Sequence, residues 1–434
     1  MDKMADVLGR AGAWCGQNKY LSAIKNAFQN FMPLTIAGAI GVLWCNVLVN
    51  DQTGLGIFFK PIMALDFLNP AFQAVNFCTI SCITVGITLG IAQEIGVWNM
   101  GAERAGYIPG LVGLAAWLSV TNTSHMVEGA KEAFTGIAGN ELGATGLFTG
   151  MIIGVLSVEL FCFFEKQDAL KIKMPEQVPP GVARAFEVLV PATITLIITA
   201  CIGSACYNLT GLYLNDVIKN GIQGPLGAVG ATIPGVMIIY LVIMLFWLVG
   251  IHGNNMLSAV KEALFTPLAL ENVEKFNKGE KPTNIINMYA LQMWGEFGGS
   301  GVTIGLVIAI MIFGKREDNK AIATLSLVPG LFNINETVTF GIPMVLNPIL
   351  GIPFVFACLV TILVGYVLTV IGFCPVACLT VPWTTPPIVF GFLACGANVM
   401  GAVTQAILIV VSTVIYVPFL IAYEKYQNKQ AAEA

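Results

Sequence analysis

Two ionisable side chains stand out because each is alone in a long apolar stretch. Glu336 is the only acidic, basic or histidine residue in 321–423, and His252 is the only one in 220–260. A carboxylate at membrane depth costs roughly 2.5–3.5 kcal/mol on insertion scales, so such a group normally faces a cavity or a partner. Imidazole exchanges a proton near neutral pH. The two groups together predict a polar solute site, with general-base catalysis or proton relay as its chemistry.

Hydrogen-bonding residues and helix breakers surround both positions. Pro329, Gly330 and Pro343 interrupt any simple helix around Glu336. Irregular backbone at membrane depth is tolerated only where it is buried in protein or lines a water-filled cavity. We therefore expect residues 321–343 to form a re-entrant hairpin that presents Glu336 to a solute. The candidate substrate-binding residues next to the two ionisable groups are Asn333, Asn335, Thr337, Gly253, Asn254 and Asn255.

Two tryptophans lie in segments rich in glycine or proline. Trp294 precedes Glu296 and the run Gly298-Gly-Ser-Gly301, and Trp383 precedes Thr384 in a proline-rich break. A rigid aromatic ring packs well on the C–H face of a sugar. The alternative is that such rings sit at the membrane interface as belts. We add Trp294, Glu296, Trp383 and Thr384 to the candidate binding residues.

The composition is that of a polytopic membrane protein. Of 434 residues, 56% are hydrophobic and 11% are charged, whereas soluble domains carry about 25% charged residues. The 11 cysteines lie mostly in apolar runs, which favours small buried side chains over a disulfide framework or a metal site. The run Gly298–Gly301 is not followed by a P-loop lysine, so nucleotide binding is unsupported. No metal, cofactor or nucleic-acid partner is expected.

The apolar runs predict an all-α membrane protein with about ten spans, two re-entrant hairpins and interfacial amphipathic helices. We divide the chain into an N-terminal transmembrane domain, 1–209, and a C-terminal domain, 210–434. One hairpin lies within 252–292, the longest polar segment, which we interpret as a hairpin plus a surface excursion. Lys3, Arg10, Lys19 and Lys25 precede the first span, so the positive-inside rule favours cytoplasmic termini.

Six short motifs in combination resemble the IIC component of the bacterial phosphoenolpyruvate-dependent sugar phosphotransferase system, in its lactose, cellobiose and diacetylchitobiose branch. The resemblance covers nearly the whole chain. One departure is Thr337, where many members of that family have proline. The motifs are Gly250-Ile-His-Gly253, Thr266-Pro-Leu-Ala-Leu-Glu-Asn272, Gly298-Gly-Ser-Gly301, Asn333-Ile-Asn-Glu336 with Phe340-Gly-Ile-Pro343, Asn347-Pro348 and Pro382-Trp-Thr384.

The resemblance implies transport of a β-1,4-linked disaccharide, with diacetylchitobiose or cellobiose as first candidates, across the bacterial inner membrane. It implies phosphorylation of the sugar 6-hydroxyl by a separate IIB protein that carries phosphocysteine and is supplied by upstream phosphotransferase proteins. It also implies a homodimer joined through the N-terminal half and a substrate chamber in the C-terminal half. Glu336 and His252 would lie near the 6-hydroxyl, and either could be the general base.

Two other functions fit the same residues. In a proton-coupled disaccharide symporter, Glu336 and His252 would form a proton relay, and the product would be free sugar rather than sugar phosphate. In a membrane scaffold without chemistry, the purified protein would bind no β-linked disaccharide.

Overall fold

The computed structural model describes residue 14 and residues 17–51, 55–57, 59–125, 134–175, 177–225, 230–342 and 344–433. Lys3 and Arg10 of the predicted cytoplasmic arm, and Pro343 of the Glu336 segment, lie outside the described residues. Helices dominate, and the sheet found in this part of the chain has two short antiparallel strands, β1 (Ser124–His125) and β2 (Phe134–Thr135). The predicted all-α class is confirmed.

The chain divides into two compact units. One unit comprises Gln17–Gly38 with Ala74–Ala228, and the other includes Ala39–Gln73 with Val229–Ala434. The proposed boundary after residue 209, and the roles assigned to the two halves, stay predictions.

In the first unit, α4, α6 and α8 pack on one another, and α9 packs on α6 and α8. Its core includes Trp117, which is 1% exposed. A Cβ at Gly113 would lie 2.3 Å from Ala92 Cβ, so a small residue there allows α6 to approach α4 closely. The helices of this unit, and α3 at its border, are α3 (Asn69–Asn76), α4 (Ile83–Met100), α5 (Ala102–Ala105), α6 (Ile108–Val120), α7 (Gly139–Leu142), α8 (Ala144–Glu165), α9 (Pro180–Thr210) and α10 (Leu214–Ile218).

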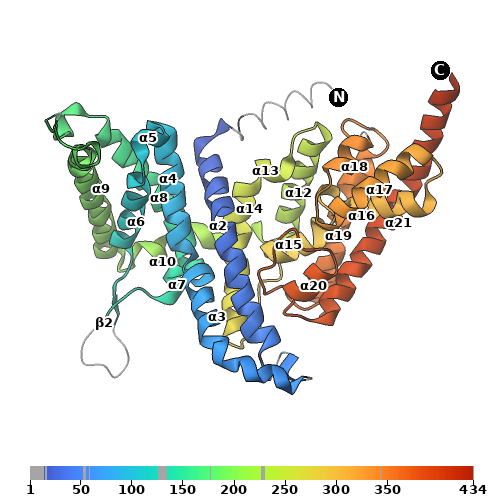
Figure 1. Ribbon diagram of the computed structural model, residues 1–434, viewed down its shortest axis with the longest axis horizontal. Helices are drawn as coiled ribbons and strands as arrows, with labels where there is room; N and C mark the ends of the chain where they lie inside the picture. The colour runs from blue at the N-terminus through green and yellow to red at the C-terminus, as the bar shows by residue number, and fades with distance from the viewer. Residues whose placement is uncertain are drawn as a thin grey trace. The chain divides into compact units, whose positions relative to one another are not determined.

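In the second unit, α21 packs along both α16 and α19, and α17 lies beside α16 (Figure 1). Most of α2 (Lys19–Leu43) belongs to the first unit, and its last residues, from Ala39 onward, belong to this one. The remaining helices are α12 (Ile233–Leu248), α13 (Gly253–Met256), α14 (Ser258–Asn277), α15 (Met288–Gly295), α16 (Ile304–Phe313), α17 (Glu317–Leu331), α18 (Glu336–Gly341), α19 (Gly351–Val370), α20 (Val389–Ala394) and α21 (Val399–Glu433).

Several helices have the length and composition of membrane spans. Within the described residues, five helices qualify, or up to seven if each of two bent helix pairs counts as one span. One bent pair is Met288–Val302 with Ile304–Phe313, which turn by 59° at Thr303. α6 and α12 are apolar but shorter than the roughly 20 residues of a full span. The number of ten crossings and the re-entry of two hairpins therefore stay predictions.

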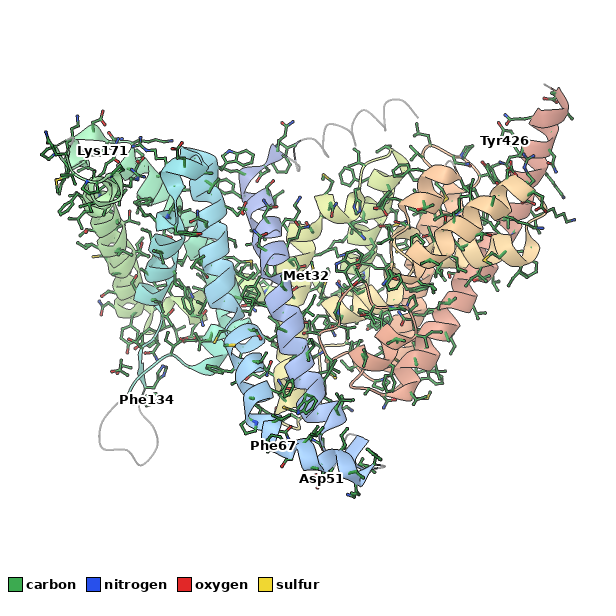
Figure 2. All side chains as sticks on the ribbon, in the orientation of Figure 1. Met32, Asp51, Phe67, Phe134, Lys171 and Tyr426 are labelled. Atoms are coloured by element: carbon green, nitrogen blue, oxygen red, sulfur yellow. The ribbon has the colours of Figure 1, made fainter. Side chains whose placement is uncertain are left out.

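Large apolar side chains are exposed on these helices. Ile197 on α9, Ile238 on α12 and Val410 on α21 are each more than half exposed, and side chains such as Phe67 and Tyr426 extend outward from the ribbon (Figure 2). In a soluble protein such surface would favour association. Around a membrane span it faces lipid tails instead, which fits the composition of the chain.

Candidate functional site

Glu336 lies at the tip of a helix–turn–helix. α17 ends at Leu331, the chain turns over residues 332–335, and α18 begins at Glu336. The turn is closed by the Ile334 amide, which donates to the Pro329 carbonyl at 3.0 Å. Asn333 has a φ of +63°, a left-handed conformation that asparagine tolerates better than most residues. The local sequence thus forms the helical reversal expected near residues 321–343.

Two asparagines fix this tip against its neighbours. Asn333 Oδ1 accepts from the Gly298 amide at 2.7 Å, and its Nδ2 donates to the carbonyls of Trp383 and Thr385. Asn335 Nδ2 donates to the Ser300 carbonyl at 2.8 Å. The tip is therefore tied both to the glycine-rich break between α15 and α16 and to the proline-rich segment before α20.

Glycine at position 299 permits this approach. Gly299 has a φ of +87°, and a Cβ there would lie 2.6 Å from Asn335 Cβ. Both the backbone angle and the space exclude other side chains. The glycine-rich break is thus required for Asn335, and with it Glu336, to reach this position.

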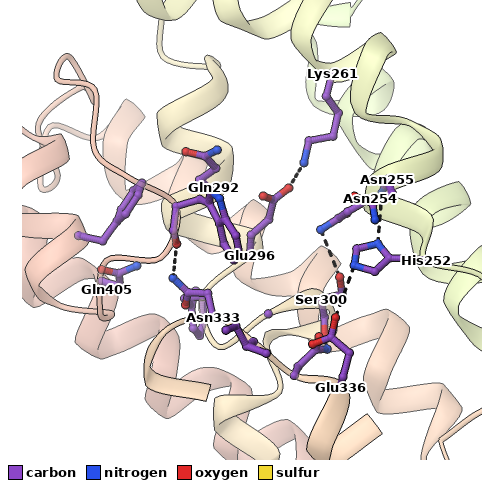
Figure 3. Close-up of a pocket in the computed structure, with 16 residues that line it drawn as sticks. His252, Asn254, Asn255, Lys261, Gln292, Glu296, Ser300, Asn333, Glu336 and Gln405 are labelled. Atoms are coloured by element: carbon purple, nitrogen blue, oxygen red, sulfur yellow. Dashed lines mark hydrogen bonds and ion pairs between the residues drawn. The ribbon is translucent and has the colours of Figure 1, made fainter. Parts of the chain in front are cut away.

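His252 faces Glu336 from the connection between α12 and α13. Its Nδ1 accepts from the Asn255 amide at 3.3 Å, and its Nε2 lies 3.8 Å from Glu336 Oε1 (Figure 3). A ring nitrogen that accepts a hydrogen bond carries no proton, so the neutral ring holds its proton on Nε2, toward Glu336. The ring also packs on Trp247, with centroids 4.4 Å apart. The two lone ionisable groups of the sequence are neighbours in space.

A cavity of about 540 Å³ opens beside this pair, within the usual ~300–1,000 Å³ of small-molecule sites. Eight of the predicted residues line it: His252, Asn254, Asn255, Glu296, Asn333, Asn335, Glu336 and Trp383. Eight further residues complete the wall: Lys261, Gln292, Phe297, Gly299, Ser300, Ile334, Phe390 and Gln405.

A second carboxylate is compensated within the protein. Glu296 Oε1 accepts from the Tyr240 hydroxyl at 2.7 Å. The same carboxylate is ion-paired with Lys261 (Figure 3). The side chains of Lys261 and Glu296 are 7% and 16% exposed, whereas those of His252 and Glu336 are 38% and 46% exposed. Such a buried pair needs additional hydrogen bonds to offset desolvation, and Tyr240 supplies one. Glu336 is thus the more accessible acid of the cavity.

Two oxygens at the cavity lack a protein partner. Asn254 Nδ2 donates to Ser300 Oγ at 3.2 Å, but Asn254 Oδ1 is buried without a hydrogen bond. Gln292 Oε1 is in the same state. An unsatisfied buried acceptor costs about 1–3 kcal/mol, and because protein atoms enclose both oxygens, a ligand in the cavity would reach them only after a local side-chain movement.

Four predicted residues are not among those that line the cavity. Trp294 is 1% exposed. Its ring packs against Gly365 of α19, so closely that a Cβ added at Gly365 would lie 2.3 Å from Trp294 Cδ1. Gly253 is buried, and a Cβ there would lie 2.0 Å from the Ile243 carbonyl oxygen. Thr337 is exposed in the first turn of α18, and Thr384 is half-buried. Each of the four is close in sequence to a lining residue (Glu336, His252, Trp383 or Glu296), but that proximity does not bring its own side chain to the wall.

Gln405 is a lining residue that the sequence did not single out, and its side chain bonds three backbone groups. Its Oε1 accepts from the amides of Ile388 and Gly391, both at 2.7 Å, and its Nε2 donates to the Met293 carbonyl. An amide in an otherwise apolar span is a signal of the same kind as Glu336, since buried polar groups need partners. Lys261 carried no such signal, because it lies in a segment with many other charged residues.

These features define a class of protein: a polytopic helical membrane protein whose broken helices present polar side chains to a small-molecule cavity, as in transporters. The family model described as "Phosphotransferase system, EIIC" matches residues 25–358. The chain belongs to this family.

Curated relatives match almost the full length. The oligo-beta-mannoside-specific EIIC component of Bacillus subtilis (strain 168) is 33% identical over 429 residues, which cover 98% of this chain and 94% of that protein. The cellobiose-specific EIIC component of Lactococcus lactis subsp. lactis (strain IL1403) is 29% identical, covering 98% of each. The crystal structure of ChbC, the IIC component of the N,N'-diacetylchitobiose-specific phosphotransferase system, matches with a TM-score of 0.88 at 29% identity, over 97% of both chains.

Proposed function

We propose that this protein carries a β-1,4-linked disaccharide across the bacterial inner membrane while a separate IIB protein phosphorylates the sugar 6-hydroxyl. The observation that carries the proposal is the His252–Glu336 pair, 3.8 Å apart on the wall of a disaccharide-sized cavity. Relatives named for oligo-β-mannosides, cellobiose and diacetylchitobiose support the substrate class. Diacetylchitobiose and cellobiose are the first candidates.

The wall chemistry supports a neutral, hydroxyl-rich ligand. Lys261 is the single lysine or arginine among the described lining residues, and it is already paired with Glu296. The amide side chains of Asn254, Asn255 and Gln292 line the cavity, and amides can exchange hydrogen bonds with sugar hydroxyls or an acetamido group. The exposed Trp383 ring offers a flat apolar surface for a sugar face.

In the mechanism we infer, the sugar 6-hydroxyl lies at Glu336. Its oxygen attacks the phosphorus of phosphocysteine, so that an O–P bond forms and the S–P bond breaks, and the thiolate leaves. Glu336 takes the hydroxyl proton, because the neutral His252 directs its Nε2–H toward that carboxylate and cannot accept there. General-base help is typically worth ~10²–10⁴ in rate, and in-line positioning supplies much of the rest.

The partners follow from this chemistry. The phosphoryl donor is a IIB protein acting in trans, supplied by the upstream phosphotransferase proteins. We also propose a homodimer joined through the N-terminal half, a multi-pass location in the inner membrane with both termini cytoplasmic, and sugar binding by the C-terminal half.

The test is uptake of radiolabelled disaccharide into proteoliposomes that contain purified IIB and its phosphoryl-donor chain. We expect sugar phosphate inside, dependence on IIB, and no loss when a protonophore collapses the proton gradient. Free sugar that accumulates without IIB and is lost with the protonophore would establish proton symport instead. No binding of any β-linked disaccharide would favour a scaffold.

A further inference from the structure

A cluster of sulfur atoms lies next to the cavity wall but is absent from the mechanism above. Cys374 Sγ and Cys395 Sγ are 3.9 Å apart, and both lie within 3.4 Å of the Pro375 carbonyl oxygen. Cys395 Sγ is also 3.8 Å from Met293 Sδ. Cys374 lies four residues after the end of α19, and Cys395 directly follows α20.

The backbone already holds these two segments together. The amides of Cys378 and Leu379 both donate to the Ala394 carbonyl, at 2.8 and 3.1 Å. Cys374 and Cys395 are 2% and 4% exposed, so neither thiol is free to move away into solvent. The two sulfurs of a disulfide lie about 2.05 Å apart, so the two Sγ atoms must approach by about 2 Å. Because the backbone holds the two segments together, rotation of the cysteine side chains has to supply that approach.

The segment between the two cysteines forms part of the site. It contains Trp383 and Phe390, which line the cavity, and its carbonyls at Trp383 and Thr385 accept from Asn333 at the tip that carries Glu336. A covalent bond across its ends would restrict the conformations open to this segment. The bond would therefore act on one wall of the cavity and on the anchor of the tip.

We propose that Cys374 and Cys395 form a reversible disulfide that clamps the segment between them, and with it the Trp383 side of the cavity. The two thiols lose two protons and two electrons to an azo-type oxidant such as diamide. One sulfur adds to an azo nitrogen to form an S–N bond. The second sulfur attacks the first, so that the S–S bond forms and the S–N bond breaks. The oxidant leaves as the hydrazine, which carries both thiol protons. A dithiol reductant reverses the step.

The experiment treats membranes that contain the full-length protein with diamide, then denatures the protein, alkylates it and digests it with chymotrypsin. Because Cys374 and Cys378 are close in sequence, the Cys378→Ala variant is run beside the wild type. We expect both proteins to yield a linked peptide pair lighter by two hydrogens than the two thiol peptides, and dithiothreitol to release it. Cys358, which is equally buried and bonds to the Gly295 carbonyl, should be alkylated throughout.

The clamp itself has a separate readout that does not depend on sugar transport. Backbone hydrogen exchange between Thr380 and Leu393 should slow on oxidation in the Cys378→Ala protein and stay unchanged in Cys395→Ala. Alkylation of both Cys374 and Cys395 after diamide, or a link to Cys395 that forms in the wild type and is lost in Cys378→Ala, would overturn the pairing. Unchanged exchange in the linked protein would overturn the clamp.

Discussion

The two acids of the cavity differ in what surrounds them. Glu296 is hydrogen-bonded to Tyr240 and ion-paired with Lys261, both largely buried. Glu336 has one ionisable neighbour within 4 Å among the described residues, His252, and its side chain is 46% exposed. A carboxylate that is fully engaged by partners within the protein, such as Glu296, has a structural role. An accessible one that faces a single imidazole can exchange a proton with a bound ligand.

The two tryptophans predicted to bind sugar should respond differently to substitution. Trp383→Ala removes an exposed ring of the cavity wall and should weaken disaccharide binding by about tenfold or more, or about 1.4 kcal/mol, with little change in stability. Trp294→Ala opens a hole in the core and should cost about 3–5 kcal/mol of stability. Calorimetric binding and thermal unfolding in detergent measure the two effects. Normal stability with lost binding in Trp294→Ala would show that its ring does contact sugar.

Asn335 and Thr337 provide a matched pair at the tip. Asn335→Ala leaves the buried Ser300 carbonyl without its donor, and such a loss costs about 1–3 kcal/mol. The tip should loosen, and disaccharide affinity should fall about 5- to 100-fold. Thr337 is exposed, so Thr337→Ala should change affinity less than about twofold, as most surface substitutions do. The reverse ranking in the same binding assay would contradict the geometry described here.

The sequence identified the ionisable residues of the site better than its neutral ones. Glu336 and His252 could be predicted because a lone charge in an apolar tract has few structural explanations. Gln292 and Gln405 were missed, although an uncharged amide in an apolar segment also needs a hydrogen-bond partner. Trp294 and Trp383 could not be separated, since their difference in burial depends on Gly365 of α19, which no local pattern reveals.

At the scale of elements, the Glu336 hairpin is held at its far end by Glu424 of α21. Glu424 is 5% exposed and accepts from the amides of Lys315 and Arg316, just before α17, and from Asn319 Nδ2. A carboxylate at a helix start satisfies orphan amides and complements the helix dipole. The sequence predicted a reversal of the chain around Glu336, and the structure has one, but re-entry into the membrane stays a prediction. The sequence gave no indication of the Glu424 contact, because it joins residues more than a hundred positions apart.

Glu424→Gln should therefore destabilise the second unit. Hydrogen bonds to charged groups contribute about 1.5–3 kcal/mol, so we expect a lower melting temperature in detergent and faster hydrogen exchange in α17. Glu433→Gln is the control, since Glu433 is exposed on the same helix and pairs only loosely with Lys429 at 3.7 Å. Equal melting temperatures for the two variants would show that Glu424 is not the anchor.

For the whole molecule, the all-α class followed from composition, whereas the number of crossings did not. α6 and α12 are shorter than a full span, and α15 and α16 form a bent pair, so apolar length alone cannot count spans. Sidedness was inferred from lysines and arginines in loops. The segment 252–292 weakened that inference, because Lys261, one of its basic residues, is buried at the cavity.

The proposed topology can be tested with fusions at the C-terminus. If that end is cytoplasmic, a fused green fluorescent protein should fluoresce and a fused alkaline phosphatase should be inactive, since the phosphatase folds only after export. An active phosphatase fusion in cells would place the C-terminus outside. With a cytoplasmic N-terminus, the number of spans would then have to be odd instead of ten.

Single-turnover phosphoryl transfer from phospho-IIB to labelled disaccharide tests the central claim most directly. The wild type and Glu336→Gln are compared after each has been saturated with sugar, so that binding and chemistry are separated. We predict that sugar 6-phosphate forms at least ~10²-fold more slowly in Glu336→Gln, as expected for loss of a general base. Equal rates in the two proteins would remove Glu336 from the reaction and contradict the account.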